Sequence, residues 1–197
     1  MKIRKLAVVA VILVFAALAS AEEYKIDKGH SQVGFVARHL TITNVNGRFT
    51  DFAGTVDFNP QDVTKSVVKI AIKTPSITTD NASRDNDLRN SEFLDVAKFP
   101  EMTFASTKVE KRGSQLVLVG NLTLKGVTKP VEIPFTLSGP VDDPWGNTRI
   151  AAEGSTEINR RDFGVTYNNK MQDGSAVVGD QVKITLEIEA VKPKAKP

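Results

Sequence analysis

The sequence predicts an all-β fold, an antiparallel β-barrel of about eight strands with a short helical segment near residues 80–95. Apolar and polar residues alternate in segment after segment, which is the period of a strand with one buried face. Turn residues separate these segments, and no helix-length spacers lie between them, as parallel crossovers would need. Closure of about eight such strands is favoured because a closed barrel leaves no exposed sheet edge.

The first 21 residues are predicted to be a secretory signal peptide. Basic residues at positions 2, 4 and 5 precede an apolar run over residues 6–18, and small residues follow at 19–21. A single membrane anchor is the alternative, but the run is shorter than the roughly 20 residues that a spanning helix needs. We therefore expect export, with cleavage after Ala21.

Composition argues against a nucleic-acid partner. Without the three basic residues of the signal peptide, 23 Lys and Arg face 23 Asp and Glu, whereas nucleic-acid binders usually show a basic excess on one face. The remaining basic cluster is Lys192, Lys194 and Lys196, which predicts a solvated basic C-terminal tail over residues 191–197. The chain has no cysteine, so export brings no disulfide framework and no lipid attachment at a cysteine.

The clearest strand pair is a long hairpin over residues 116–137. Leu116, Leu118, Leu122 and Leu124 share one face of its first strand, and residues 131, 133, 135 and 137 repeat the pattern in the second. Gly126 and Pro130 are predicted to mark the turn, because glycine accepts unusual φ angles and proline cannot donate a ladder hydrogen bond. A hairpin with one apolar face needs an interior to cover it.

The other strands are taken from the same alternation. They cover residues 33–38, 49–58, 68–73, 102–109, 150–158 and 182–188. Gly54 indicates a bend or bulge. Residues 79–95 lack alternation and predict one or two helical turns capped by Asp80, Asn81 or Ser83. Residues 138–148 and 168–179 are predicted to be irregular.

A barrel of this size either is filled by side chains or encloses one small ligand. Small residues at inward positions leave room for a ligand, but they are also how a tapered barrel packs; they are Ala37, Gly120, Ala152 and Gly154. Pattern alone leaves both interiors open. A filled barrel would serve as a stress-protection or interaction module.

Catalysis is a weaker alternative. A hydrolase or metal enzyme would use His30, Ser31 and His39, but no G-x-S-x-G elbow surrounds Ser31 and no cysteine or acidic ligand motif accompanies the histidines. We expect no enzyme activity, no cofactor and no metal.

Several motifs, in order along the chain, resemble the YceI family. They are IDKGHSQVGF at 26–35 with His39, NGRF at 46–49 with Phe52 and Gly54, RDNDLR at 84–89, EFLD at 92–95, FPEMTFAS at 99–106, GNLTLKGVTKPV at 120–131 and NRRDFG at 159–164. The match spans essentially the whole chain after residue 21. Asn86–Asp87 depart from it, since His is common before the leucine in that family.

The resemblance implies a lipocalin-like, periplasmic YceI-like barrel over residues 22–190 that encloses a long hydrophobic pore. It implies non-enzymatic binding or transport of an isoprenoid-tailed lipid, either a polyisoprenoid or a quinone-like molecule, sometimes as a homodimer, with transient membrane contact as part of the transfer.

We expect the pore to be lined by a set of aromatic residues and one leucine, namely Phe35, Phe49, Phe52, Phe58, Phe104, Leu118, Phe135 and Phe163. The lipid head group is expected at a polar mouth formed by His30, His39, Arg84, Arg89, Arg160 and Arg161.

Overall fold

The structure, a computed structural model, describes residues 21–194 of the chain. The predicted signal peptide lies outside the described residues except for Ala21, and its prediction stays a prediction. Among the described helices none is long and apolar enough to cross a membrane.

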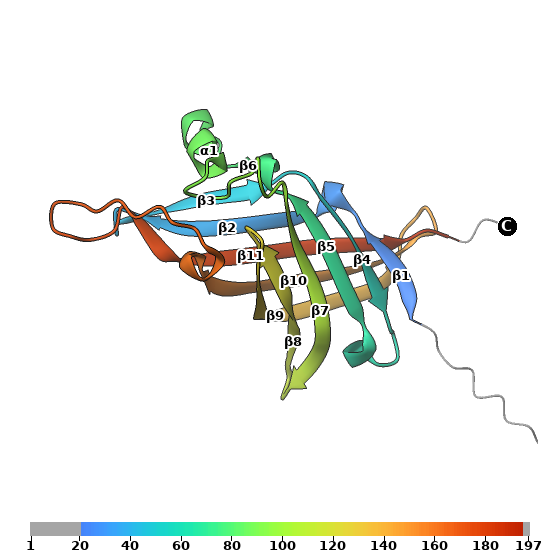
Figure 1. The fold of residues 1–197 in the computed structure, drawn as a ribbon. Helices are drawn as coiled ribbons and strands as arrows, with labels where there is room; N and C mark the ends of the chain where they lie inside the picture. The colour runs from blue at the N-terminus through green and yellow to red at the C-terminus, as the bar shows by residue number, and fades with distance from the viewer. Residues whose placement is uncertain (1–20, 195–197) are drawn as a thin grey trace, which may run out of the picture.

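The described residues form eleven strands and five short helices around one interior (Figure 1). The strands are β1 (Glu22–Ile26), β2 (Gln32–His39), β3 (Thr43–Phe49), β4 (Phe52–Phe58), β5 (Val67–Lys73), β6 (Ile77–Thr78), β7 (Glu101–Arg112), β8 (Gln115–Leu124), β9 (Val127–Asp142), β10 (Thr148–Asn159) and β11 (Val178–Lys192). The α-helix is α1 (Ala82–Arg89), and the 3-10 helices are η1 (Lys28–His30), η2 (Val63–Lys65), η3 (Thr74–Ser76) and η4 (Arg160–Phe163).

Eight of these strands close into an antiparallel barrel, which confirms the predicted fold class. The order around the ring is β1, β4, β5, β7, β8, β9, β10 and β11, and β1 returns to β11 through the pairs Lys25↔Val191 and Ile26↔Ala190. The C-terminal boundary predicted at residue 190 falls inside β11, which continues to Lys192. Lys192 pairs with Glu22 and lies over the ring of Tyr24, so it is part of the barrel wall rather than of a solvated tail.

Strands β2 and β3 extend the wall beyond the ring. β2 pairs with β11 from Val178 to Glu187, and β3 pairs with β2 along its whole length. The sequence pattern missed β3 because its residues, TNVNGRF, are mostly polar and include a glycine. That glycine, Gly47, lies against the ring of Phe35, where an added Cβ would come within 2.2 Å of the ring. Close approach to an inward aromatic side chain therefore explains the glycine.

The helical segment follows β6, which pairs with the end of β3 at Phe49↔Ile77. Its helix, α1, stands beside β6 at the top of the barrel in Figure 1. Asn81 is the N-cap, since its side chain accepts a hydrogen bond from the Arg84 amide. This confirms the helix and one of the three predicted caps.

The structure corrects the sequence predictions for the hairpin turn and for the β-bulge. The hairpin turns at Lys125–Gly126, both with positive φ, and Pro130 lies within β9. β4 pairs regularly with β5 through Gly54, so no bulge is present there; an added Cβ would lie 2.3 Å from the Lys69 carbonyl oxygen. A register shift in β7 between Ser106 and Lys108 instead turns Val109 inward.

On the outer face of the barrel, two ion pairs of Arg112 bridge β7 and β9 across β8, and this group is called the Arg112 strap. Arg112 donates to Glu110 on its own strand, β7, and to Glu132 on β9, and β8 lies between these two strands. Val117 pairs in register with Glu110 and is only 3% exposed, although Leu118 faces the interior. The strap therefore shields an outward valine that alternation alone would leave in solvent.

Candidate ligand-binding interior

The barrel encloses an apolar cavity of about 180 Å³. A single buried water needs roughly 10–15 Å³ and several polar partners, so this cavity has room for much more than a water. Its lining side chains are apolar except for Thr156 and Arg160. Such a surface favours an apolar guest over water.

A second cavity, of about 90 Å³, lies toward the end of the barrel where β9 and β10 meet. Its lining includes Leu137, Ile150 and Ala190, and Ser66 is its only polar side chain. The Ser66 hydroxyl already accepts a hydrogen bond from the Asn59 amide. This end of the interior therefore offers little to a polar group.

The two cavities are adjacent, because four side chains line both, and the boundary formed by these side chains is called the neck. The neck residues are Ile70, Leu118, Ile133 and Leu186. They come from β5, β8, β9 and β11, which are spread around the ring. A long chain entering the larger cavity would have to pass between these four side chains to reach the smaller one.

The small inward residues do not all provide space. Ala37 lines the larger cavity and Ala152 the smaller. At Gly120 an added Cβ would lie 2.4 Å from the ring of Phe104, and at Gly154 it would lie 2.8 Å from the Pro134 carbonyl oxygen. The two glycines therefore accommodate close neighbours, which is the packing role that the sequence left open.

The predicted pore residues divide into cavity-lining and core residues. Phe35, Phe49 and Phe104 line the larger cavity, Phe58 and Phe135 the smaller, and Leu118 both. Phe52 and Phe163 are buried in the hydrophobic core but are not among the lining residues of either cavity.

Arg160 is the one charged side chain on the cavity lining in the described part of the chain. Its guanidinium, 5% exposed as a residue, donates to the carbonyls of Tyr167, Val178 and Gly179 and to Asp180. These bonds hold the segment 164–177, which connects η4 to β11, across one end of the barrel. Burial lowers the pKa of Arg160, and Asp180 opposes that shift.

The same carboxylate serves a second arginine. Asp180 also accepts from Arg161 Nε at 2.8 Å, and Arg161 further donates to Asn168. Two guanidinium groups thus share one carboxylate, so the electrostatic balance at this end of the cavity is positive. An arginine has five N–H donors, and among the described residues four of those on Arg160 have acceptors.

The predicted mouth residues are not brought together in one place. His39 ends β2 opposite Val178 and so lies at the same end as Arg160 and Arg161. Arg84 and Arg89 instead fix α1: Arg84 donates to Thr79, and Arg89 donates to the carbonyls of Pro75 and Ile77. Two N–H groups of Arg84 and three of Arg89 thus donate within the protein and hold α1 in place.

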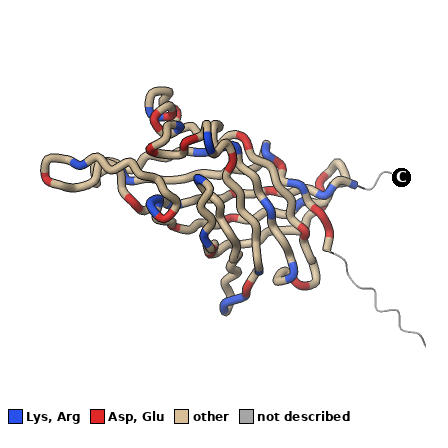
Figure 2. The backbone as a smooth tube through the Cα atoms, in the orientation of Figure 1, with Lys and Arg blue, Asp and Glu red and all other residues tan. Residues whose placement is uncertain are grey.

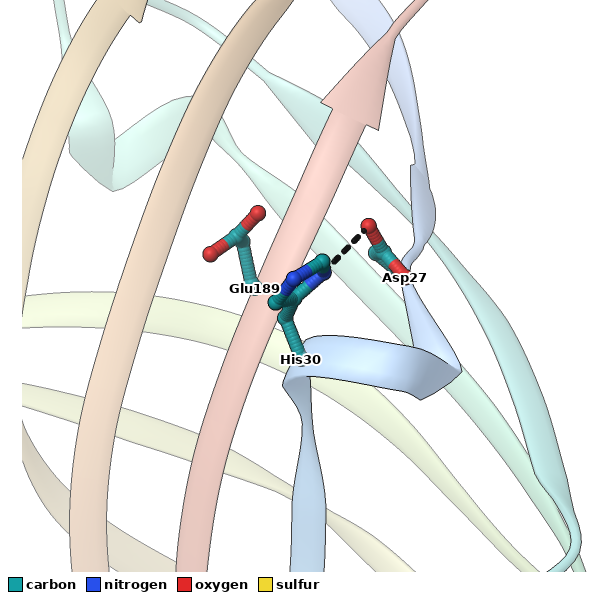
Figure 3. Close-up of side chains that lie close together, drawn as sticks. All are labelled: Asp27, His30 and Glu189. Atoms are coloured by element: carbon teal, nitrogen blue, oxygen red, sulfur yellow. Dashed lines mark hydrogen bonds and ion pairs between the residues drawn. The ribbon is translucent and has the colours of Figure 1, made fainter.

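His30 lies in η1, at the other end of β2 from His39, so the two histidines are not placed to share a metal or a substrate. His30 Nδ1 lies 2.9 Å from Asp27 Oδ2, and Figure 3 shows Glu189 beside them. Asp27, His30 and Glu189 are close enough to hold a metal ion. However, the Arg149 guanidinium already bonds to both carboxylates.

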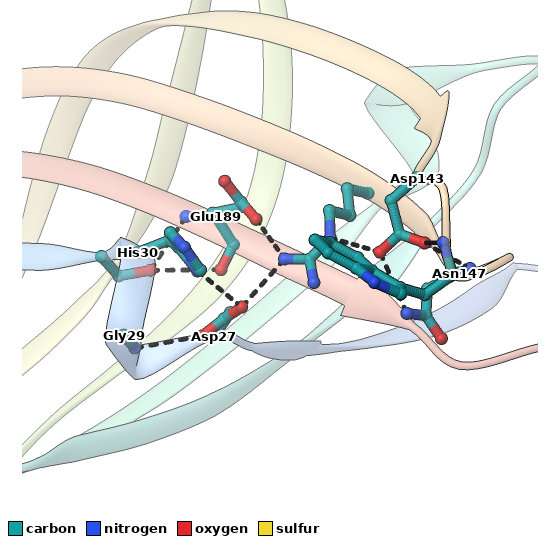
Figure 4. A network of polar contacts seen from close by, with 9 residues as sticks. Asp27, Gly29, His30, Asp143, Asn147 and Glu189 are labelled. Carbon is teal, nitrogen blue, oxygen red and sulfur yellow. Dashed lines mark hydrogen bonds and ion pairs between the residues drawn. The ribbon is translucent and has the colours of Figure 1, made fainter.

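Ser31 has a structural role as well. Its hydroxyl donates to the Glu189 carbonyl and accepts from the Glu189 amide, which ties η1 to β11. The polar network continues through Arg149 to Asp143 and Asn147 in the β9–β10 turn (Figure 4). The His30 and Arg149 hydrogen bonds lower the pKa of Asp27 to about 2.

The sequence analysis missed the cavity-lining side chains of α1 and of the segment that follows it. Leu88, Phe93 and Leu94 line the larger cavity, and Phe93 stacks on Tyr167. The signal available was the group of apolar residues at 88, 93 and 94 in an otherwise polar stretch, which an isolated, solvated helix would not need.

An antiparallel barrel with an apolar, two-chambered interior and one buried cation at its end defines the class of small-ligand-binding barrels. The sequence profile of the YceI-like domain matches residues 24–190. The chain is 42% identical over 178 residues to "Protein YceI" of Salmonella newport (strain SL254), covering 89% of this chain and 90% of that protein. The chain therefore belongs to the YceI-like family.

Solved structures show the same fold. The crystal structure of Burkholderia cenocepacia BcnA aligns with a TM-score of 0.73 at 21% identity, over 83% of this chain and 98% of that one. A polyisoprenoid binding domain from Saccharophagus degradans, implicated in plant cell wall breakdown, aligns with a TM-score of 0.65 at 16% identity, over 86% of this chain and 98% of that one.

Proposed function

We propose that this protein binds an isoprenoid-tailed lipid in its barrel interior and carries it through the periplasm, without catalysing a reaction. The observation that carries the proposal is the pair of adjacent apolar cavities that share the neck side chains. The polyisoprenoid binding domain from Saccharophagus degradans, which has the same fold, supports an isoprenoid lipid as the class of ligand. The predicted signal peptide supports the location.

Partition supplies the driving force. Each CH₂-sized group that leaves water for an apolar interior contributes about 0.8 kcal/mol. The lipid's alternative is a bilayer rather than water, so the net gain on entering the barrel is far smaller. A near-balanced exchange lets a carrier both load and release its cargo.

The polar end of the lipid belongs beside Arg160. This is where the cavity lining carries a cation, with Thr156 as its other polar side chain. One N–H of Arg160 is left for a ligand oxygen, and the positive balance of Arg160, Arg161 and Asp180 favours an acceptor or an anion there. The tail would then run from this end through the neck toward the smaller cavity.

The decisive experiment is native mass spectrometry of the exported protein, purified without detergent, followed by organic extraction. A stoichiometric adduct identified as a polyprenyl chain or a quinone is expected. If the protein carries no adduct, long-chain isoprenoids are added and the thermal midpoint is followed, since a ligand that binds only the folded state raises it. No adduct and no rise in the midpoint would overturn the proposal.

A matched pair of variants assigns the binding to the interior. Ala152→Phe fills the smaller cavity, and Ala82→Phe adds the same ring on exposed α1. The first is expected to lose the adduct and the second to keep it. Gly154 is unsuitable for this purpose, because its Cβ alone would collide with Pro134.

A further inference from the structure

The wall of the barrel is split between β9 and β10 at the end that holds Arg160. The register of this pair of strands ends at Gly154↔Phe135. Beyond that point β9 stays paired with β8, and β10 stays paired with β11. Residues 127–134 of β9 and 155–159 of β10 are therefore two strand edges that do not pair with each other, and this split is called the seam.

Two prolines explain why β9 does not pair with β10 along the seam. Pro134 directs its carbonyl toward β10, since a Cβ on Gly154 would lie 2.8 Å from the Pro134 carbonyl oxygen. Alternate residues of a strand direct their backbone groups to the same neighbouring strand, so Pro130 also faces the β10 side. A proline has no N–H to donate to a ladder. The β9 edge of the seam therefore lacks two of the donors that pairing with β10 would need.

The larger cavity lies directly behind the seam. Val131 and Ile133 line this cavity from β9, and Thr156 and Ile158 line it from β10. Ile133 and Ile158 are both buried, so the seam is covered on its outer side. A covered split in the wall, with an apolar cavity behind it, is a route by which a lipid tail can pass sideways once the cover moves.

The cover is η4, which continues from β10 and lies next to β9 as well as β11. Its Phe163 is 2% exposed and belongs to the same hydrophobic cluster as Val131 of β9. Its polar contacts lie on the other side, where Arg160 bonds to Asp180 on β11. Within the described part of the chain, no hydrogen bond or ion pair joins residues 160–164 to β9. η4 is thus fixed to one side of the seam and held to the other by apolar contact alone.

Neither charge nor the opposite end of the barrel indicates another route. Acidic and basic residues are interspersed over the barrel wall (Figure 2). At the opposite end the ladder between β9 and β10 is intact, and the ion pair of Arg149 with Asp143 holds the turn that joins the two strands. The seam is therefore the place where the wall around the larger cavity lacks strand pairing.

We propose that the isoprenoid tail enters and leaves the interior sideways through the seam, and that Phe163 is the side chain that closes it. η4 moves away from β9 and keeps its attachment to β11, and the connection that follows it, including Tyr167, moves with it. The head group then stays beside Arg160 while the tail passes between the strand edges, so no polar group crosses the apolar cavity. This inference rests on the proposed function, because it gives the route of the same lipid.

A covalent bridge across the seam tests the route. Glu132 and Glu157 are exposed on the two unpaired edges, at positions that would face each other if the register continued. The chain has no cysteine of its own, so Glu132→Cys and Glu157→Cys together can be loaded with radiolabelled geranylgeraniol and then joined by a bismaleimide. Transfer of the label to phosphatidylcholine vesicles should be slower by roughly tenfold or more than in the same variant treated with a monofunctional maleimide, because the bridge blocks the opening that gates release.

A matched bridge joins the same two strands where they already pair. Thr136 and Glu153 are both exposed and lie opposite each other in the ladder. Bridging Thr136→Cys with Glu153→Cys should leave the transfer rate unchanged. Phe163→Leu keeps an apolar side chain but removes the ring from the cover, and it should speed transfer several-fold.

Equal transfer rates with and without the bridge across the seam would overturn the inference, and so would equal slowing by the two bridges. Binding itself is measured separately, by native mass spectrometry of the unmodified protein with added isoprenoids. Isoprenoid bound normally but released through a bridged seam counts against the route alone. A protein that binds no isoprenoid would instead overturn the proposed function, and the route with it.

Discussion

Phe93 stacks on Tyr167 with ring centroids 4.6 Å apart and planes at 26°. Phe93 belongs to the segment after α1, and Tyr167 to the connection after η4. The amides of Thr166 and Tyr167 both donate to the Glu92 carbonyl, so backbone bonds reinforce the stack. Since Phe93 also lines the larger cavity, these two irregular segments together close one side of the interior.

Tyr167→Ala should therefore weaken the contact between the two segments that close this side of the interior. Loss of the stack is expected to cost about 1–2 kcal/mol of unfolding free energy, and bound isoprenoid should exchange faster. Urea unfolding measures the first effect, and transfer of a labelled isoprenoid to vesicles measures the second. Tyr167→Phe keeps the ring and should behave as wild type; an unchanged exchange rate in Tyr167→Ala would show that entry lies elsewhere.

Leu118→Phe should narrow the neck. Short isoprenoids that fit in the larger cavity should bind with nearly unchanged affinity, while long chains should weaken roughly tenfold, which corresponds to about 1.4 kcal/mol. Dissociation constants for a series of chain lengths test this selectivity. Leu118→Met conserves volume and is the control. An equal loss of affinity for isoprenoids of every chain length would mean that no isoprenoid chain passes the neck.

Arg160→Met should destabilise the fold and weaken head-group binding. Removing the guanidinium leaves three carbonyls and Asp180 without their buried donor, which is expected to cost about 3 kcal/mol or more. Arg161→Met, in a side chain that is one-third exposed, should cost much less. Thermal midpoints with and without ligand compare the two variants. Equal costs would contradict the role given to Arg160.

Acid should weaken the network that ties the β9–β10 turn to the wall. Burial opposes ionisation of Asp143, but hydrogen bonds from Arg149 and Asn147 outweigh it and hold the Asp143 pKa well below its usual range. The pKa of Asp27 is about 2 instead of 3.8. A lowered carboxyl pKa stabilises the folded state above the unfolded pKa, and this contribution is lost as pH falls through the folded value.

Asp143→Asn should therefore lower stability near neutral pH and flatten the decline in stability as pH falls below 3.8, the ordinary value for this carboxyl group. Urea midpoints over this range provide the measurement. Asp142→Asn, at the exposed neighbour, removes a carboxylate from the same turn and controls for the change in net charge. A steeper decline in Asp143→Asn than in wild type would refute the assignment.

Alternation predicted the wall of the barrel because its strands bury one face. Val182, Ile184 and Leu186 on β11 line the larger cavity as their period indicates. The pattern could not show β3, where pairing with β2 holds a polar sequence, or the outward Val117, which is buried under the Arg112 strap. Those depend on neighbours that are distant in sequence.

The site was harder to predict because side-chain roles depend on partners. Phe35 and Phe52 look alike in sequence, yet only Phe35 is on the cavity lining. Arg160 and Arg89 both lie in polar stretches of the sequence. In the structure, however, Arg160 lines the cavity, whereas Arg89 donates hydrogen bonds to the carbonyls of Pro75 and Ile77. Charge and residue type alone do not separate them.

The seam between β1 and β11 sets the order in which the barrel can form. Its ion pair, Lys192 with Glu22, joins residues 170 positions apart. A contact of that separation forms only once the final strand is available, and its loop-closure entropy makes it a late and slow step. Until then the apolar faces of the intervening strands stay exposed, so this chain is expected to be most prone to aggregation just before its two ends meet.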